Sequence, residues 1–268
     1  MAGVSAPSAP TPAMFHNRRQ PPEHPDRIEG QALLPFADRA AAGCLLATHL
    51  LALGFGEPTG HKPGAATQGD APIIVLALPR GGVPVAAIVA EALHAPLDLL
   101  LVRKIGAPQQ PELAVAALVD GTPPEVVIDH RLRALTGADD VHVAREARAA
   151  IAENERRRRL YLGGRAPLPL GGRTVIVVDD GVATGTTLRA ALQVVRKQQP
   201  ARLVVAVPVS SREAAARLRA EADEWVCLAE PLPFEAVGRH YLRFEQVGDD
   251  EVVRLLADTV MNKRCGRG

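Results

Sequence analysis

The sequence predicts an α/β fold in which a mostly parallel β-sheet is flanked by helices on both faces. Short runs of branched apolar residues alternate along the chain with longer segments of helical periodicity. The apolar runs also contain few regularly spaced polar positions. Strands of this kind are buried on both faces, which is typical of a parallel sheet covered by helices.

In the first part of the chain, each element follows from a local pattern. Apolar spacing predicts a helix at 33–53 that ends at Gly54 and Gly56, and a Gly- and Pro-rich loop follows at 54–72. The elements expected next are a buried strand at 73–78, a turn at 79–82, a helix at 83–93 and a second buried strand at 97–102, which ends at Arg103 and Lys104.

In the second part, segment 105–128 is expected to hold two shorter strands with a turn between them at 121–124. The longest helix is expected at 139–162, with Asp139 or Asp140 as its N-cap. Its four arginines at 156–159 suit the negative end of the helix dipole and are expected to be exposed. The remaining expected elements are strands at 174–178, 203–207 and 225–228 and helices at 187–198, 211–220 and 249–260.

The composition is that of a globular protein of 268 residues, with 47% hydrophobic and 3% aromatic residues. A formal net charge of +1 gives no reason to expect nucleic acid or a membrane as partner, and no apolar run has the length of a membrane span. Three widely spaced cysteines favour a cytoplasmic location. Residues 1–28 are expected to be a disordered tail, followed by a domain at 29–260 and a short tail at 261–268.

The segment VIVVDDGVATGTT, residues 175–187, carries the strongest functional signal. Its apolar run ends at Asp179 and Asp180, and a loop of small and hydroxylated residues leads into the next helix. Backbone N–H groups at a helix N-terminus can bind a phosphate, and Gly185 allows a close approach. The two carboxylates can accept hydrogen bonds from the vicinal hydroxyls of a sugar, and they can bind Mg²⁺.

Cationic residues are expected to follow two other strands, at Arg80 and at Arg103 and Lys104. Because ligands of open parallel sheets bind at the carboxyl ends of the strands, these side chains are expected to face the same crevice and to meet a second anionic group. A Walker A loop is disfavoured because its lysine is missing, and no GxGxxG fingerprint occurs. A strand followed by two aspartates also occurs in Walker B segments and phospho-acceptor domains. A turn with a capping Thr is the purely structural alternative.

Segment 175–187 resembles the PRPP-binding signature of type I phosphoribosyltransferases, which has four apolar residues, two acidic residues and a loop that ends in T-G-x-T. It departs from that pattern at Gly181, where the family usually has a branched apolar residue, and this departure is expected to alter only the flexibility of the loop. The resemblance covers about 33–258 and is closest to a bacterial group with a VRKIGAP…PELA segment. It implies a cytoplasmic enzyme of nucleotide salvage, a homodimer, and a small hood at about 105–135 and 230–245.

The resemblance implies Mg²⁺-dependent transfer of the 5-phosphoribosyl group of PRPP to a nitrogen of a nucleobase-like acceptor, with release of pyrophosphate. Asp179 and Asp180 would bind the ribose hydroxyls and help to place Mg²⁺. Arg103 and Lys104 would neutralise the leaving pyrophosphate. The resemblance further assigns the 5′-phosphate to Ala183, Thr184, Gly185, Thr186 and Thr187, and the pyrophosphate to Arg80, Gly81 and Gly82.

The acceptor site is expected after the last predicted strand, where Phe234 and Tyr241 could stack on a flat ring. Packing in the core is the alternative for both. Ala183 stands where 6-oxopurine enzymes have a proton-transferring Asp, so the loop is more similar to that of adenine phosphoribosyltransferases. Glu112 and Asp120 are the candidates for proton transfer. The competing hypotheses are a regulator that binds PRPP or a nucleotide without turnover, and an unrelated kinase-like or hydrolase domain.

Overall fold

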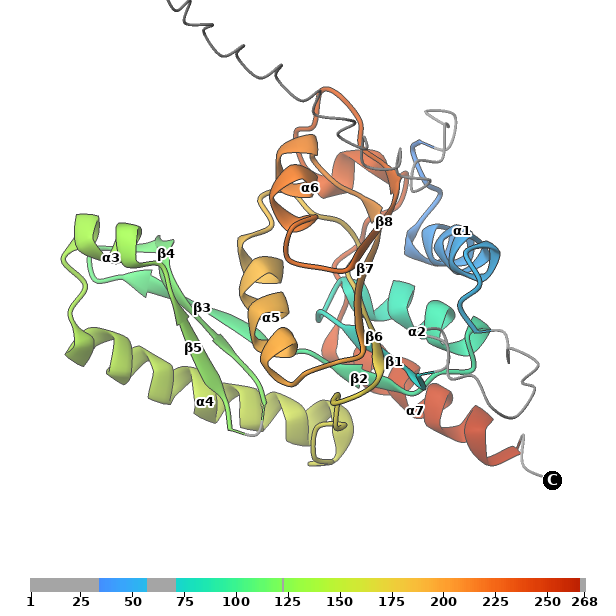
Figure 1. The fold of residues 1–268 in the computed structure, drawn as a ribbon, viewed down its shortest axis with the longest axis horizontal. Coiled ribbons are helices and arrows are strands. Elements are labelled where there is room, and N and C mark those ends of the chain that lie inside the picture. The colour runs from blue at the N-terminus through green and yellow to red at the C-terminus, as the bar shows by residue number, and fades with distance from the viewer. Residues whose placement is uncertain (1–33, 57–70, 122, 266–268) are drawn as a thin grey trace, which may run out of the picture.

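A five-stranded parallel sheet with strand order β2-β1-β6-β7-β8 forms the centre of the molecule, which confirms the predicted fold class. The computed structural model describes residues 34–56, 71–121 and 123–265 (Figure 1). The predicted tail at 1–28 and residues 57–70 of the predicted loop lie outside this range. The strands are β1 (Ile73–Ala77), β2 (Leu97–Leu99), β6 (Thr174–Val178), β7 (Arg202–Val209) and β8 (Glu224–Ala229).

Helices cover both faces of this sheet, and the strands are therefore apolar on both sides (Figure 1). Val75 and Ala77 of β1 belong to one buried cluster, whereas Ile74 and Leu76 belong to the other. The first cluster is closed by α1 (Arg39–Ala52), α2 (Gly82–Ala92) and α7 (Asp249–Cys265), and the second by α5 (Thr186–Lys197) and α6 (Arg212–Leu218). None of the helices in the described residues combines the length and the apolar character that a membrane crossing requires.

A second, antiparallel sheet extends away from the first, together with two helices (Figure 1). We call this part, residues 102–162, the arm. Its strands pair in the order β3-β4-β5. β4 and β5 are the two shorter strands expected in segment 105–128, and β3 is an additional strand. The arm consists of β3 (Val102–Ala107), β4 (Gln110–Val119), β5 (Glu125–Ile128), α3 (His130–Thr136) and α4 (Asp140–Leu162). Asp139 caps α4, since its carboxylate accepts a hydrogen bond of 2.7 Å from the His142 N–H.

The prediction of a single strand at 97–102 is wrong. β2 ends at Leu99, and Arg103 and Lys104 lie inside β3, where they pair with residues of β4. Leu100 and Leu101 between the two strands are buried, so the apolar run continues through the break and hides it. Arg103 and Lys104 therefore do not stand at the carboxyl end of a parallel strand.

The exposure expected for the four arginines near the end of α4 is wrong for Arg158. Its Nε donates to Asp120 (2.8 Å), and its Nη1 lies 3.4 Å from Asp98, which is 1% exposed. Asp98 interrupts the apolar run of β2, and a buried carboxylate of this kind requires a partner. Arg158 supplies it and thereby ties the base of the arm to the parallel sheet.

Two helix boundaries differ from the predictions. The first helix begins at Arg39, not near residue 33, because Asp38 is its N-cap and accepts from the Ala41 N–H at 2.9 Å. At the other end, α7 continues past residue 260 to Cys265, so the part of the expected tail that the structure describes is helical.

Candidate functional site

The Gly- and Thr-rich loop follows β6 at the carboxyl edge of the parallel sheet and leads into α5. It is held to the neighbouring strand, because the Val182 N–H donates to the Val209 carbonyl and the Ser211 N–H donates to the Val182 carbonyl, both at 2.9 Å. The Ser211 hydroxyl also donates to the Ala183 carbonyl at 2.6 Å. These bonds fix the path of the loop before it reaches the helix.

The N-terminus of α5 presents several backbone N–H groups. Gly185 is the N-cap, with φ of +72°, a left-handed conformation that glycine adopts without steric cost. Within the described part of the chain, no hydrogen bond occupies the N–H groups of Ala183, Thr184, Thr186 or Thr187. The side chains of Thr184 and Thr186 are exposed beside them. Free N–H groups at a helix N-terminus, with hydroxyls next to them, can bind a phosphate.

Gly181 lacks a side chain because other residues fill the space. A Cβ at this position would lie 2.5 Å from the Val237 Cγ1 and 2.9 Å from the Val209 Cγ1. Val237 belongs to a short 3₁₀ helix, η2 (Val237–His240). The departure from the family pattern at Gly181 is therefore explained by packing against η2.

Asp179 and Asp180 lie where β6 ends. The Asp180 N–H donates to Asp179 Oδ1 at 2.9 Å, and Arg39 Nε donates to Asp180 Oδ2 at 2.7 Å. Burial and the Asp180 carboxylate raise the pKa of Asp179 well above its usual value. Burial also raises the pKa of Asp180, although the Arg39 guanidinium opposes this. The site thus holds two buried carboxyl groups side by side, and the positive charge of Arg39 partly offsets their negative charge.

The turn at 79–82 packs directly against the aspartates, because β1 and β6 are neighbours in the sheet. A Cβ on Gly81 would lie 2.1 Å from Asp180 Oδ2, and a Cβ on Gly82 would lie 2.9 Å from the Asp179 Cα. A side chain at Gly81 would displace the Asp180 carboxylate, and one at Gly82 would collide with the backbone of β6 and Asp179. The loop after β6 and the turn after β1 therefore form one continuous edge.

Arg80 within this turn pairs with a carboxylate from α7, which is in turn bonded to a residue of α4. Its Nη1 lies 3.4 Å from Asp249 Oδ1, and this carboxylate accepts a hydrogen bond of 2.6 Å from the Tyr161 hydroxyl. The Pro79–Arg80 peptide bond is cis. The Gly82 N–H donates to the Leu78 carbonyl at 3.0 Å, whereas the N–H groups of Arg80 and Gly81 have no partner among the described residues. Those two N–H groups and the guanidinium are available to an anion.

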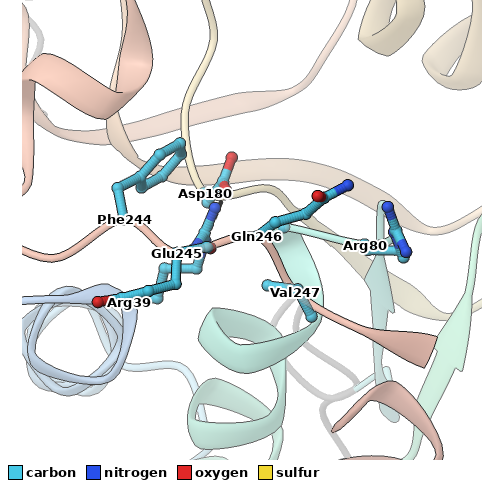
Figure 2. Close-up of a pocket in the computed structure, with 8 residues that line it drawn as sticks. Arg39, Arg80, Asp180, Phe244, Glu245, Gln246 and Val247 are labelled. Atoms are coloured by element: carbon cyan, nitrogen blue, oxygen red, sulfur yellow. Dashed lines mark hydrogen bonds and ion pairs between the residues drawn. The ribbon is translucent and has the colours of Figure 1, made fainter. Parts of the chain in front are cut away.

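A cavity of about 390 Å³ is bounded on one side by the turn and Asp180 and on the other by residues 244–247 (Figure 2). Cations and acids both line it, so it suits a ligand that carries anionic groups and hydroxyls. Its walls are formed by Arg39, Arg80, Gly81, Asp180, Phe244, Glu245, Gln246 and Val247.

The structure does not bring the predicted residues of the arm to this cavity. Arg103 lies 3.5 Å from Glu153 of α4, and Lys104 is exposed. Glu112 is exposed on β4, and Asp120 lies 2.6 Å from Arg158 Nη2. Asp120 therefore has a structural role at the base of the arm.

The two aromatic candidates for the acceptor site lie in different surroundings. Tyr241 is 6% exposed and packs on Phe36, with ring centroids 5.4 Å apart. Its hydroxyl donates to the Asp180 carbonyl at 2.5 Å, so Tyr241 supports the site from within the core. Phe234 is half-buried and lies against His240, with ring centroids 4.9 Å apart.

The donor set for a metal is small. Among the described residues, no three His, Cys, Asp or Glu side chains gather closely enough to hold a metal ion. Asp179 and Asp180 supply two carboxylates, and Mg²⁺ is typically bound by one or two carboxylates together with substrate phosphates and water. These residues therefore fit Mg²⁺ that arrives with a phosphorylated ligand.

Sequence reasoning missed most of the cavity wall, namely Arg39 and residues 244–247, and it also missed Asp249, which pairs with Arg80. Arg39 is separated from Asp180 by 141 positions, and no local pattern signals such a contact. In the sequence, Asp249 is explained by its place in the first turn of a helix, where a carboxylate interacts favourably with the positive end of the helix dipole. Phe244 lies in the segment where an aromatic contact was expected, but at a position not singled out.

Comparison with known proteins agrees with this geometry. The profile of the family described as "Phosphoribosyl transferase domain" matches residues 65–241. Two proteins of Mycobacterium tuberculosis, MT0597 of strain CDC 1551 and Rv0571c of strain H37Rv, are provisionally named phosphoribosyl transferases. Each is 44% identical over 222 residues, which cover 82% of this chain and 46% of the relative. The chain thus spans about half the length of these curated relatives.

A solved structure is matched over nearly its whole length. The crystal structure of TT1426 from Thermus thermophilus matches with 44% identity and a TM-score of 0.68, over 84% of this chain and 99% of that one. Both the signature loop and the turn at 79–82 lie within the segment that the family profile matches. The chain therefore belongs to the phosphoribosyl transferase domain family.

Proposed function

We propose that this protein transfers the 5-phosphoribosyl group of PRPP to a nitrogen of a nucleobase-like acceptor and releases pyrophosphate, with Mg²⁺ as cofactor. The observation that carries this proposal is the contact between the turn at 79–82 and Asp180, since a Cβ on Gly81 would lie 2.1 Å from the carboxylate. The turn packs on the acidic pair, and the loop that follows the pair leads to the N-terminus of α5, so two groups for anions adjoin the same two acids. A sugar with a phosphate at one end and a pyrophosphate at the other suits such a site.

The donor would bind along this edge in three parts. The 5′-phosphate would accept hydrogen bonds from the free N–H groups between Ala183 and Thr187. The ribose hydroxyls would donate to Asp179 and Asp180. The pyrophosphate would meet Arg80 and the free N–H groups of the turn.

The chemistry is a displacement at ribose C1. The bond from C1 to the pyrophosphate oxygen breaks, the acceptor nitrogen forms the new bond to C1 with its lone pair, and the proton on that nitrogen would pass to a general base. The transition state has oxocarbenium character, so the carboxylates of Asp179 and Asp180 stabilise the positive charge on the sugar while Arg80 stabilises the leaving anion. Mg²⁺ bound with the donor would supply further compensation for the pyrophosphate charge. Asp179 and Asp180 would hold it.

Two residues are proposed for the acceptor side. Phe234 stays a proposal as a stacking residue, and Glu112 stays a proposal for proton transfer. Among the described residues, Glu112 forms no hydrogen bond or ion pair with Asp179 or Asp180, and the ring contact of Phe234 is with His240. A homodimer is a further expectation from the family resemblance.

A regulator that binds PRPP without turnover is the second candidate, and one observation favours it. Arg103 is engaged by Glu153, and neither Arg103 nor Lys104 makes a contact with the aspartate pair among the described residues. A protein that only senses the donor requires no cation near the leaving group beyond Arg80.

The experiment is to incubate the protein with PRPP, Mg²⁺ and a panel of bases, and to measure pyrophosphate release. Base-dependent release supports the transferase. Saturable PRPP binding without release from any base supports the regulator, and the absence of both contradicts the proposal. Asp180→Asn should lower the rate about 10²–10³-fold. Asp258→Asn, an exposed acid on α7, is the matched control and should leave it unchanged.

A further inference from the structure

Arg39, the first residue of α1, joins three segments of the site. Its Nε donates to Asp180 Oδ2 at 2.7 Å, and its Nη1 donates to the Glu245 carbonyl at 2.8 Å. The carbon of its guanidinium lies 3.8 Å from the centroid of the Phe244 ring. One side chain therefore uses two donors and one planar face at the same time (Figure 2).

This arrangement is confined. The side chains of Arg39 and Asp180 are 12% and 13% exposed. A hydrogen bond between charged groups with little access to water is directional, and it restricts the rotation of the carboxylate. Stacking on Phe244 restricts the guanidinium in turn.

The backbone of Asp180 is fixed as well. The Tyr241 hydroxyl donates to the Asp180 carbonyl, and the segment around Tyr241 is bonded to the residues before α1, since the Phe36 N–H donates to the His240 carbonyl at 2.8 Å. Asp38, next to Arg39, forms an ion pair with Arg243. The start of α1 and segment 240–245 thus form one frame that carries Arg39.

We propose that Arg39 is a positioning residue, which holds the Asp180 carboxylate in the orientation that binds the ribose hydroxyls of the donor. The inference rests on the proposed function and extends it to a residue outside the signature loop. A lysine at this position keeps the charge, but its single ammonium group cannot bond Asp180, bond the Glu245 carbonyl and stack on Phe244 together.

The test compares three ligands on the full chain. Binding of PRPP, ribose 5-phosphate and inorganic pyrophosphate is measured by calorimetry in the presence of Mg²⁺, for the wild type and for Arg39→Lys. We expect Arg39→Lys to bind PRPP and ribose 5-phosphate about tenfold more weakly, because the diol loses an oriented carboxylate. Pyrophosphate has no diol, so its affinity should change less than about twofold.

Arg159→Lys is the matched control, since it makes the same substitution at a side chain that is 66% exposed and does not line the cavity. It should bind all three ligands as the wild type does. If Arg39→Lys does not fold, Phe244→Leu removes the stacking ring and keeps an apolar side chain. It should show the same selectivity with a smaller loss.

Three outcomes distinguish a failure of the positioning role of Arg39 from a failure of the proposed function. Selective loss for the two ribose-containing ligands supports the positioning role. An equal loss for all three ligands, or no loss, overturns it. A wild type that binds neither PRPP nor ribose 5-phosphate overturns the proposed function itself, whatever Arg39 does.

Discussion

The contact between the two loops of the site can be tested with a single methyl group. Gly81 has φ of −60° and ψ of −36°, a conformation open to any residue. Gly81→Ala therefore introduces no backbone strain. The whole effect of the substitution comes from the contact of the new Cβ with Asp180.

The size of the effect follows from the distances. The Cβ would lie 2.1 Å from Asp180 Oδ2, and an ordinary contact begins near 3.4 Å, so the turn and the carboxylate must separate by about 1.3 Å. A misplacement of about 1 Å at a reacting centre costs about 10²-fold in rate. In the absence of that contact, Gly→Ala in a compatible conformation would stabilise the protein by about 0.4–1 kcal/mol.

The assay is pyrophosphate release together with thermal unfolding. We expect Gly81→Ala to lose about 10²-fold in kcat/KM and to gain no stability. Gly171→Ala is the control, since a Cβ there would lie 3.4 Å from the nearest atom. It should leave the rate unchanged. A Gly81→Ala variant that is more stable and fully active would refute the close packing of the turn on Asp180.

Three further predictions concern stability. Gly181→Val should lower the free energy of unfolding in urea by about 1–3 kcal/mol, because its side chain overpacks against Val237. An added Val237→Ala should restore part of that free energy. An unchanged free energy of unfolding in the single variant would contradict the packing argument. Arg158→Met should cost about 3–5 kcal/mol because it removes the guanidinium that Asp98 and Asp120 share at the base of the arm. Arg159→Met, at a side chain that is 66% exposed, should cost under about 1 kcal/mol, and equal costs would argue against a buried network. Because the pKa of Asp179 is raised in the folded state, the free energy of unfolding should fall as the pH rises from the usual Asp range through the raised value. Asp179→Asn should remove that fall and unfold at a higher temperature than the wild type at neutral pH; a lower temperature would reverse the sign of the argument.

The parallel sheet could be predicted from the sequence because each strand has a local signature. β6 runs over Thr174–Val178, as expected, since its apolar run is closed by two acids. The break between β2 and β3 has no such signature, because Leu100 and Leu101 are as apolar as the strands they separate. Periodicity reports burial and cannot distinguish one buried strand from two.

The site was predictable only where it is local in sequence. The loop from Gly181 to Thr187 and the turn at 79–82 carry their chemistry in consecutive residues. Arg39 acts through a contact with Asp180 that spans 141 positions, and Gly181 is explained by Val237. Such contacts depend on how helices and loops pack around the sheet. No local pattern in a single sequence indicates which distant residues will meet.

The proposed function requires that the loop after β6 binds the phosphate of a phosphorylated ribose while the adjacent acids bind its hydroxyls. A crystal of the protein soaked with PRPP and Mg²⁺ would reveal whether it does. We expect density for the 5′-phosphate within hydrogen-bond distance of the N–H groups of Thr184, Thr186 and Thr187, with the ribose hydroxyls on Asp179 and Asp180. Density for the ligand elsewhere, with this loop unchanged and unliganded, would show that the proposal is wrong.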